Sequence, residues 1–573
     1  MDDLDRYDRA ARQIAALTRE QVTARCRRDP DRAAALLRMW YRWRLADFAA
    51  QVMAPMLREI GPVSPPGPLD RAIYSLPVDR PGHREAGHQQ LVMTGRGVGK
   101  TTRQKIRRLH GLLYGWSPLA VAIAQTDPDA KGWIDTINGW AENPGDILAR
   151  LFPELRSSAS ERELTLTTRF GASTILARGW TASMRGLNEG GRRPDSLDLD
   201  DVEAEERSVT TAARDNTQSR LTAKVLPLCP LEGGGYVTWC QTPVDPDAVA
   251  VRAARRTEDL MGWDVSSLPV ISRWPDRDDL WAEARAIYFD ADARPDKIDR
   301  VRAVRAFYAE HQAEMNEGIE LLDPHRLGPV AVHMRLWDVG KTAFAREYEM
   351  RASMPGTCFD PASWPRHVVA LDGAATRLHR EGGGVVWLRE VPMWAHLDTS
   401  DGGDDAALVV CAWVRGRVCE VGSSIWTGAR LSRVLREVAP ALHHFAQVGL
   451  HDLHWEPPPG AASVVEDEIR RALADAGLSL RLVAVPSTEN KNARIVNTLE
   501  PLADGGLLSL CADIDRRAVA QAAGFRPGRH DNTDDWLDAL QRCAEGLMGH
   551  GDHDPDPIDA STWGQVAAAL GSW

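Results

Sequence analysis

The sequence has no uninterrupted apolar run of about 18 residues, so it offers no candidate transmembrane helix. It has no Cys-x-x-Cys pair, and the scatter of its eight cysteines argues against a zinc site and a disulfide framework. The start MDDLDRYDRAAR is too acidic for a signal peptide. The chain also lacks an excess of basic residues: its net charge of −12 argues against a protein that coats DNA passively. These absences favour an intracellular, reduced protein that would bind nucleic acid only through a local basic patch.

The length of 573 residues is too great for one core and predicts two or three domains. Hydrophobic residues make up 43% and charged residues 26%, as in ordinary globular proteins. Residues 1–80 are predicted to form a helical leader, because Ala, Arg and Leu recur there at helical spacing before the break GPVSPPGPL at 61–69. The rest is divided into predicted domains at 81–345 and 366–573.

The stretch Leu91–Thr102, LVMTGRGVGKTT, predicts a buried strand, a glycine-rich turn and a helix start. Such a turn can wrap backbone amides around a polyphosphate, with Lys100 on the β- and γ-phosphates and the Thr101 hydroxyl on Mg²⁺. Thr94 stands where the usual motif has its first glycine. The alternative is a chance glycine turn before a basic helix. The predicted nucleotide-binding residues are Gly95, Arg96, Gly97, Val98, Gly99, Lys100, Thr101 and Thr102, with ATP as the ligand.

A carboxylate cluster follows at 194–206, PDSLDLDDVEAEE. An NTPase needs one acid at a strand end for Mg²⁺ and another to orient the attacking water. Asp200 is assigned to the metal, and Asp201 or Glu203 to the water. Asp198 interrupts the apolar run, so a solvated acidic loop is the alternative interpretation.

The segments around these motifs alternate between strand and helix. A helix is expected over 101–113, a strand over 119–124, a helix over 127–148 and a hairpin over 164–176; a further strand over 233–243 would end in Gln241 and Thr242. This order predicts an α/β fold with a mostly parallel sheet. Arg96 and Arg185 are cations that could face the phosphates; from the sequence alone, a structural or solvated role is favoured for each of them.

Together these pieces resemble the large terminase subunit of tailed phages, the DNA-packaging motor. The resemblance is carried by TGRGVGKTT, by GWTASMRGLNEGGRRPDSLDLDDVE, by the strand ending in CQTP and by the segment Thr342–Pro361, and it covers most of residues 85–545. In that family an arginine precedes the loop lysine by four residues, which Arg96 matches. An Arg-Gly pair before the acidic strand is matched by Arg185 and Gly186.

The resemblance implies a P-loop ATPase domain with a helical linker over 81–345 and a ribonuclease-H-like nuclease over 366–573. Such a protein would drive double-stranded DNA into a procapsid with ATP and cut concatemeric DNA. The implied partners are DNA, the portal protein, the small terminase subunit and further copies in a ring on the procapsid. The implied location is the cytoplasm of an infected bacterium and, transiently, the portal. The implied ions are Mg²⁺ at the ATPase site and two Mg²⁺ or Mn²⁺ ions at the nuclease site.

The implied nuclease needs three acids from separate elements, which can hold two ions about 4 Å apart. Strands are expected over 394–400, 406–414, 417–422 and 447–456, and an amphipathic helix over 530–540. The chosen acids, for both catalysis and metal binding, are Asp398, Glu456 and Asp535, with Asp534 the near rival of Asp535. Asp372 is a competing first acid and Asp405 a supporting one. Lys491 and Arg494 match a basic pair seen in similar nucleases and could contact DNA phosphate; a solvated helix face explains them equally well.

Two other functions remain open from the sequence. One is a helicase-type or repair ATPase fused to a nuclease, which would separate DNA strands. The other is a non-enzymatic docking protein with decayed motifs, for which Thr94 and Asp198 are the best support.

Overall fold

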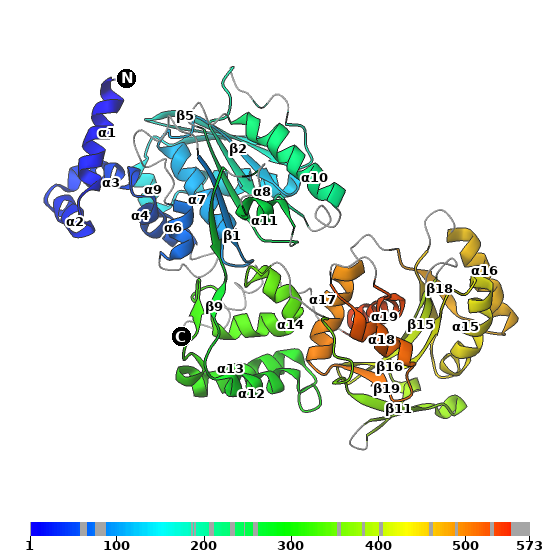
Figure 1. The fold of residues 1–573 in the computed structure, drawn as a ribbon. Coiled ribbons are helices and arrows are strands. Elements are labelled where there is room, and N and C mark those ends of the chain that lie inside the picture. The colour runs from blue at the N-terminus through cyan, green and yellow to red at the C-terminus, as the bar shows by residue number, and fades with distance from the viewer. Residues whose placement is uncertain are drawn as a thin grey trace.

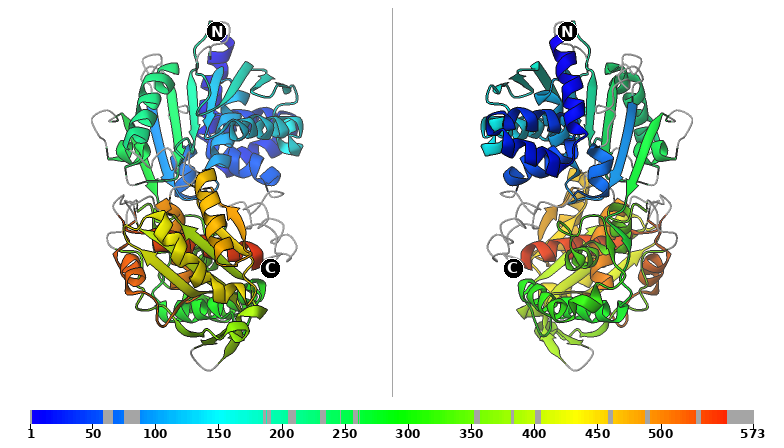
Figure 2. Two further views of the ribbon diagram at one scale, coloured as in Figure 1. Left: turned by 90° about the vertical axis from the view of Figure 1, so that its right-hand side faces the viewer. Right: turned by 90° about the vertical axis from the view of Figure 1, so that its left-hand side faces the viewer.

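The computed structural model in Figure 1 shows a helical leader, two α/β units and a helical linker between them. It describes residues 2–57, 66–74, 88–184, 187, 191–204, 211–229, 235–245, 247–255, 260, 262–351, 357–380, 384–399, 405–457, 462–486, 491–527 and 532–551. The two views of Figure 2 show that the two sheets occupy separate halves of the molecule. Within these described ranges, no helix combines the length and hydropathy needed to cross a bilayer.

The leader is packed onto the first α/β unit. Its α-helices are α1 (Asp2–Ala15), α2 (Arg19–Arg28), α3 (Ala33–Arg42), α4 (Leu45–Phe48), α5 (Ala54–Leu57) and α6 (Pro68–Tyr74). The Arg42 guanidinium donates to the Tyr114 carbonyl at 2.7 Å and lies over the Trp116 ring. Trp40, Phe48 and Met53 of the leader lie fully buried in a core that they share with the first sheet. The leader is therefore part of the hydrophobic core of this unit.

The first sheet is mostly parallel, which confirms the predicted fold class. Its strands are β1 (His88–Thr94), β2 (Leu119–Ala124), β3 (Arg156–Ala159), β4 (Glu163–Thr168), β5 (Gly171–Gly179), β6 (Ser196–Asp200), β7 (Tyr236–Gln241) and β8 (Trp263–Leu268), in the order β3-β4-β5-β2-β6-β7-β1-β8. Its helices are α7 (Lys100–Leu113), α8 (Asp127–Glu142), α9 (Gly145–Leu151), α10 (Thr211–Arg220) and α11 (Val249–Ala254). The single helix expected over 127–148 is two helices, because Pro144 ends the first and caps the second.

Strand β6 contains a buried charge that the sequence did not explain. Asp198 is fully buried, and its carboxylate accepts hydrogen bonds from Arg108 Nε at 2.5 Å and from Arg107 at 3.3 Å. Arg108 also donates to Ser196 Oγ at 2.7 Å. Because both arginines come from α7, the acid that interrupts the apolar run fixes the helix after the phosphate loop to the sheet.

Asp198→Ala is expected to lower the free energy of unfolding by about 3–5 kcal/mol, because two arginines would stay buried without their counter-charge. Urea unfolding followed by circular dichroism measures this loss. The control is Asp299→Ala, which removes an exposed pair with Arg302 at 3.0 Å and should have little effect. Equal losses in the two variants would show that the Asp198 pair contributes nothing beyond a surface contact.

A helical linker joins the two α/β units. It contains α12 (Asp278–Phe289), α13 (Lys297–Met315) and α14 (Pro329–Glu347), with the short pair β9 (Ile271–Arg273) and β10 (Glu320–Leu321). Helix α14 is broken at Gly340, whose φ is +80°. At this break the buried Glu500 carboxylate accepts hydrogen bonds from the Thr342 amide and hydroxyl, both at 2.9 Å. The two hydrogen bonds attach the linker to the second unit.

The second unit is a nine-stranded sheet with helices on both faces. Its strands are β11 (Arg366–Ala370), β12 (Arg377–Arg380), β13 (Val385–Trp387), β14 (Met393–Asp398), β15 (Ala406–Val414), β16 (Arg417–Trp426), β17 (Asp452–Trp455), β18 (Arg481–Ala484) and β19 (Leu508–Cys511). Its helices are α15 (Leu431–Ala446), α16 (Ala462–Asp475), α17 (Lys491–Asp504), α18 (Arg516–Gly524) and α19 (Asp535–Gly551). The order β16-β15-β14-β17-β18 places the end of β14 beside the end of β17, with which β14 pairs in parallel.

Two candidate active sites

The glycine-rich turn lies between the end of β1 and the start of α7. Gly97 and Gly99 have φ of +80° and +79°, which glycine adopts without strain. A Cβ on Gly95 would lie 2.5 Å from the Glu347 carbonyl oxygen, so only glycine fits there. Thr94, the departure from the usual motif, donates its hydroxyl to the Leu268 carbonyl at 2.8 Å. Thr94 therefore ties β1 to β8 at the base of the turn.

The predicted nucleotide site brings together the ends of three parallel strands. Lys100 Nζ lies 2.7 Å from both Asp201 Oδ2 and Thr242 Oγ1. The Thr242 amide also donates to Asp201 Oδ1 at 2.8 Å. The Thr101 hydroxyl donates to Asp200 Oδ1 at 2.8 Å. The loop lysine and threonine are thus each in contact with one acid at the end of β6.

Asp200 is a buried carboxylate held by two donors. Trp133 Nε1 donates to Asp200 Oδ2 at 3.0 Å, while Thr101 donates to the other oxygen. Burial, reinforced by the neighbouring Asp201 charge, raises the pKa of Asp200 to about 6. A carboxylate in this position is one that a bound cation would stabilise in its charged form.

Glu203, the other acid proposed for the water, has a different set of contacts. Its two carboxylate oxygens accept hydrogen bonds from the Val249 and Ala250 amides, each at 2.7 Å. It therefore caps the first turn of α11, while Asp201 is the acid in contact with Lys100. Burial raises the pKa of Glu203 to about 7, against the effect of the two amides, which lower it.

Glu203 should make stability depend on pH. Between about pH 4.3, the ordinary glutamate pKa, and pH 7, the folded chain holds more protons at Glu203 than the unfolded chain. The stability contributed by Glu203 therefore falls as pH rises through this window and stays lost above it. Glu203→Gln removes this pH-dependent contribution to stability. The melting temperature of the wild type minus that of the variant should therefore decrease from pH 5 to pH 8. A constant difference would contradict the prediction; Glu310→Gln on the exposed face of α13 is the control.

Of the two arginines proposed to face the phosphates, the structure describes only Arg96. Arg96 is largely exposed and pairs with Glu347 at 3.7 Å, at the end of α14. It thus faces the linker and not the Lys100–Asp201 pair in this structure. Arg185, with Gly186, lies outside the described residues.

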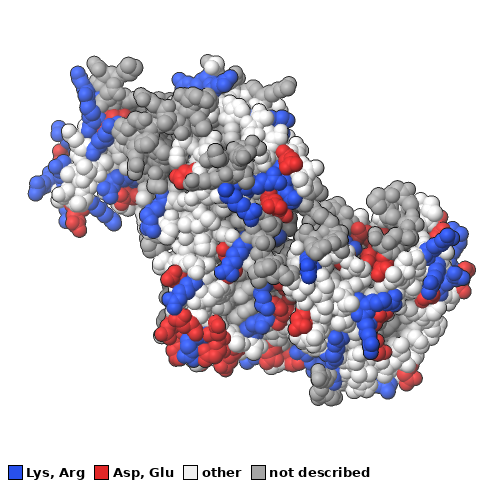
Figure 3. Space-filling model, viewed as in Figure 1, with Lys and Arg blue, Asp and Glu red and all other residues white. Residues whose placement is uncertain are grey.

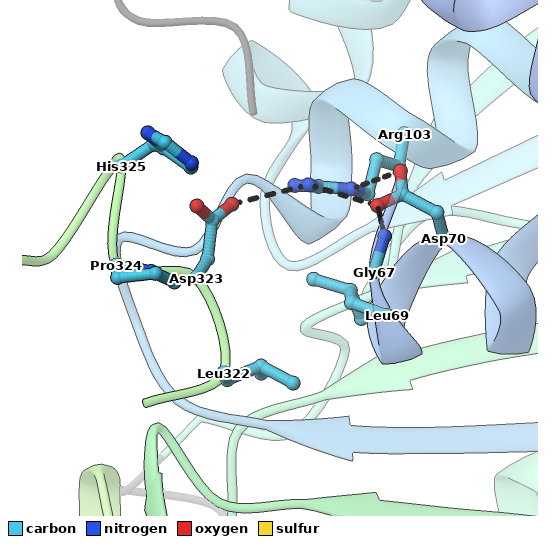
Figure 4. Close-up of a pocket in the computed structure, with 8 residues that line it drawn as sticks. All are labelled: Gly67, Leu69, Asp70, Arg103, Leu322, Asp323, Pro324 and His325. Atoms are coloured by element: carbon cyan, nitrogen blue, oxygen red, sulfur yellow. Dashed lines mark hydrogen bonds and ion pairs between the residues drawn. The ribbon is translucent and has the colours of Figure 1, made fainter. Parts of the chain in front are cut away.

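A cavity of about 200 Å³ lies beside Arg103, between the leader and the linker (Figure 4). Arg103, on the first turn of α7, lies between Asp70 at 2.8 Å and Asp323 at 3.2 Å, and also donates to the Val98 carbonyl at 2.5 Å. A second hollow shares Asp70 and Arg103 and reaches Gly99 and Thr102. The leader and the linker therefore line the first cavity together with Arg103, and the second hollow reaches the end of the turn at Gly99.

The second candidate site lies at the ends of β14 and β17 and the start of α19. Lys491 Nζ lies 2.9 Å from Asp534 Oδ1, 3.5 Å from Asp538 Oδ2 and 3.7 Å from Asp398 Oδ2. Arg542 lies 3.2 Å from Glu456 Oε2. The acids chosen from the sequence thus come together from separate elements.

The acids at this site are crowded and only partly exposed, with Asp534 and Asp538 buried and Asp398 and Glu456 18% and 32% exposed. Burial, reinforced by the charges of Asp538, Asp535 and Glu456, raises the pKa of Asp398 to about 8, although Lys491 acts to lower it. Burial likewise raises the pKa of Asp535 to about 6, with Asp534 and Asp405 adding to the shift. Such carboxylates suit a hard divalent cation in their chemistry. In the described part of the chain, however, no three His, Cys, Asp or Glu side chains are grouped closely enough to hold one ion.

Asp372, the alternative to Asp398 as the first acid of the nuclease, lies away from this cluster. Asp372 follows β11, which β19, β16 and β15 separate from β14. Its side chain is 73% exposed and pairs with Arg377 at 3.7 Å. The structure therefore groups Asp398, and not Asp372, with Glu456 and the acids of α19.

Sequence reasoning missed several side chains that complete these sites. They are Asp70, Arg103, Trp133 and Asp323 at the first site and Arg542 at the second. Asp538 was placed at the start of the last helix but not among the chosen acids, and it contacts Arg494. Arg542 had a usable signal, because positions 534, 538 and 542 lie at i, i+4 spacing on one helix face. The first four come from distant segments and carry no local pattern.

No protein-family model matches the chain, and no curated protein sequence matches it. Solved structures do match. The large terminase from a thermophilic bacteriophage aligns with a TM-score of 0.50 at 9% identity, over 84% of this chain and 99% of that one. The bacteriophage HK97 large terminase matches with a TM-score of 0.28 at 13% identity, over 83% of this chain and 93% of that one. The large terminase nuclease from thermophilic phage G20c matches with a TM-score of 0.23 at 14% identity, over 33% of this chain and 98% of that one. The resemblance to phage large terminases is confirmed for the fold by the first of these structures, which aligns over most of both chains and both α/β units.

Proposed function

We propose that this protein is a large terminase subunit, which hydrolyses ATP to move double-stranded viral DNA into a procapsid and cuts the DNA with a metal-dependent nuclease. The observation that carries the proposal is the presence of both sites in one chain of terminase fold. Lys100 and Thr101 contact the two acids at the end of β6, and a carboxylate cluster gathers at the ends of β14 and β17. The proposed partners are the portal protein, the small terminase subunit and further copies in a ring on the procapsid.

At the first site the turn 95–99 would hold the phosphates of ATP through its amides, with Lys100 on the β- and γ-phosphates. Thr101 and Asp200 would hold Mg²⁺, which shields phosphate charge when bound. Asp201 is assigned to the attacking water, because Glu203 is committed to the amides of α11. The cavity beside Arg103 would take the nucleoside end of ATP.

At the second site Asp398, Glu456, Asp534 and Asp535 are the carboxylates proposed to hold Mg²⁺ or Mn²⁺, which would activate water and stabilise the phosphodiester charge when bound. Because no three described carboxylates are grouped to hold an ion in this structure, they would have to move closer together to do so. DNA would be held through phosphates, without sequence preference, so binding should weaken with salt. Figure 3 shows positive and negative residues interspersed on one face, with acidic residues gathered over α12 and α13. We propose that DNA does not run over that acidic region and binds where Lys and Arg side chains are exposed.

Two assays on the purified full-length chain test the proposal. ATP hydrolysis should be stimulated by linear double-stranded DNA, and plasmid cleavage should require Mn²⁺ or Mg²⁺. A fluorescent strand-separation assay should show no opening of the duplex. Strand opening would favour a helicase-type enzyme, and the failure of a labelled ATP analogue to bind would favour a docking protein.

A further inference from the structure

A turn of the helical linker, residues 323–327, lies against the phosphate loop. A Cβ added to Gly97 would lie 3.4 Å from the Leu327 side chain. A Cβ added to Gly99 would lie 2.9 Å from Arg326 Nη1. The linker turn therefore contacts the two glycines whose positive φ angles shape the loop, and it brings a guanidinium to the last of them.

Within the described residues, the Arg326 guanidinium makes no hydrogen bond and no ion pair. Its neighbour Arg103, whose Nη1 lies 3.1 Å from the same Cβ position on Gly99, is held differently. Arg103 lies between the carboxylates of Asp70 and Asp323, as Figure 4 shows. These four charged side chains sum to zero, but both acids are in direct contact with Arg103. Arg326 is thus a cation beside a second cation, with its nearest acids already engaged.

Arg326 is half-buried in the second hollow, which Gly99 and Thr102 also line. Burial lowers the pKa of Arg326, and the charge of Arg103 adds to the decrease, although Asp323 acts to raise the pKa. The folded chain therefore holds this guanidinium in a place where its charge is unfavourable. An anion bound in the hollow would stabilise the charged form, because it would supply the direct partner that the guanidinium lacks.

We infer that the Arg326 guanidinium binds the α-phosphate of ATP, so that the linker supplies a substrate-binding residue to the ATPase site. The inference rests on the proposed ATP site and adds a residue to it. Lys100 is assigned to the β- and γ-phosphates and the cavity beside Arg103 to the nucleoside, so the α-phosphate would lie between them. The hollow that Arg326 shares with Gly99 and Thr102 is at this place. The planar guanidinium can donate two parallel hydrogen bonds to phosphate oxygens.

The test is calorimetric titration of the full-length chain with ADP and with a non-hydrolysable ATP analogue. Both nucleotides carry the α-phosphate, so both should bind Arg326→Gln about 10- to 100-fold more weakly than wild type. The melting temperature without nucleotide should stay the same or rise, because the variant removes a charge that has no direct partner. Arg326→Lys keeps the charge and should recover part of the affinity. Arg302→Gln, which removes an exposed ion pair of the same linker, is the matched control.

Wild-type affinity of Arg326→Gln for both nucleotides would overturn the inference. A loss confined to the ATP analogue would also overturn it, since the contact would then be to the γ-phosphate. A purely structural role predicts the opposite pair of results, a lower melting temperature without nucleotide and unchanged affinity. The proposed function fails separately: if Lys100→Ala binds both nucleotides as tightly as wild type, the turn 95–99 is not the ATP site. If the wild type binds neither nucleotide, the proposed function and the inference are both overturned.

Discussion

Lys100→Ala is expected to lower DNA-stimulated ATP hydrolysis by about 100-fold or more, because it removes the cation aimed at the transferred phosphate. Lys100 is buried, and its ammonium contacts Asp201 and Thr242 at the ends of two strands. No other lysine lies in the turn or the first four residues of α7. The loss should therefore appear in hydrolysis and in ATP binding together.

Phosphate release measures this effect, with ATP binding followed by a fluorescent analogue. Lys131→Ala, on the exposed face of α8, is the control and should hydrolyse ATP as the wild type does. Plasmid cleavage should persist in Lys100→Ala, since the second site is built from other elements. Retained hydrolysis in Lys100→Ala would mean that the turn 95–99 is a structural feature and not an ATP site.

Asp398→Asn is expected to lower metal-dependent plasmid cleavage by about 1,000-fold, because it removes a charged oxygen from the group that would hold the ion. The amide has nearly the same shape as the carboxyl group. Burial raises the pKa of Asp398 to about 8, so a neutral side chain should fit the folded protein without loss of stability. The variant thus separates the chemical role of Asp398 from its structural one.

The control for this variant is Asp372→Asn. Asp372 is the exposed acid after β11, away from the cluster, and its replacement should leave cleavage unchanged. Gel analysis of supercoiled plasmid with Mn²⁺ compares the two variants directly, and ATP hydrolysis by both should match the wild type. Cleavage lost in Asp372→Asn and kept in Asp398→Asn would move the nuclease to the other end of the sheet.

The main elements of both sites could be predicted because parallel strands bring their carboxyl ends to one edge. The apolar runs before Gly95, Asp200 and Gln241 identified three such strands. The acid at the end of the second strand, Asp200, contacts Thr101 at the start of the helix after the phosphate loop. Asp398 and Glu456 came together for the same reason, since β14 and β17 are neighbours.

The two departures that weakened the sequence argument have long-range explanations. Asp198 is neutralised by Arg107 and Arg108, about 90 residues earlier in the chain. Thr94 bonds to Leu268, 174 residues away. Neither partner could be inferred from a local pattern, because the pairing depends on which strands become neighbours. The same is true of Arg103, whose partners come from the leader and the linker.

The capped break in α14 has a mechanical consequence. The helix that supplies Glu500 to the break begins with Lys491, nine residues earlier, and a helix rises about 1.5 Å per residue. Helix α17 thus lies between two regions: Lys491 at its start contacts the second candidate site, and Glu500 nearer its other end contacts the break in α14. A tilt of the part of α14 after Gly340, which ends at Glu347 beside Arg96 and Gly95, is therefore expected either to break the two Thr342 hydrogen bonds or to move α17 with it.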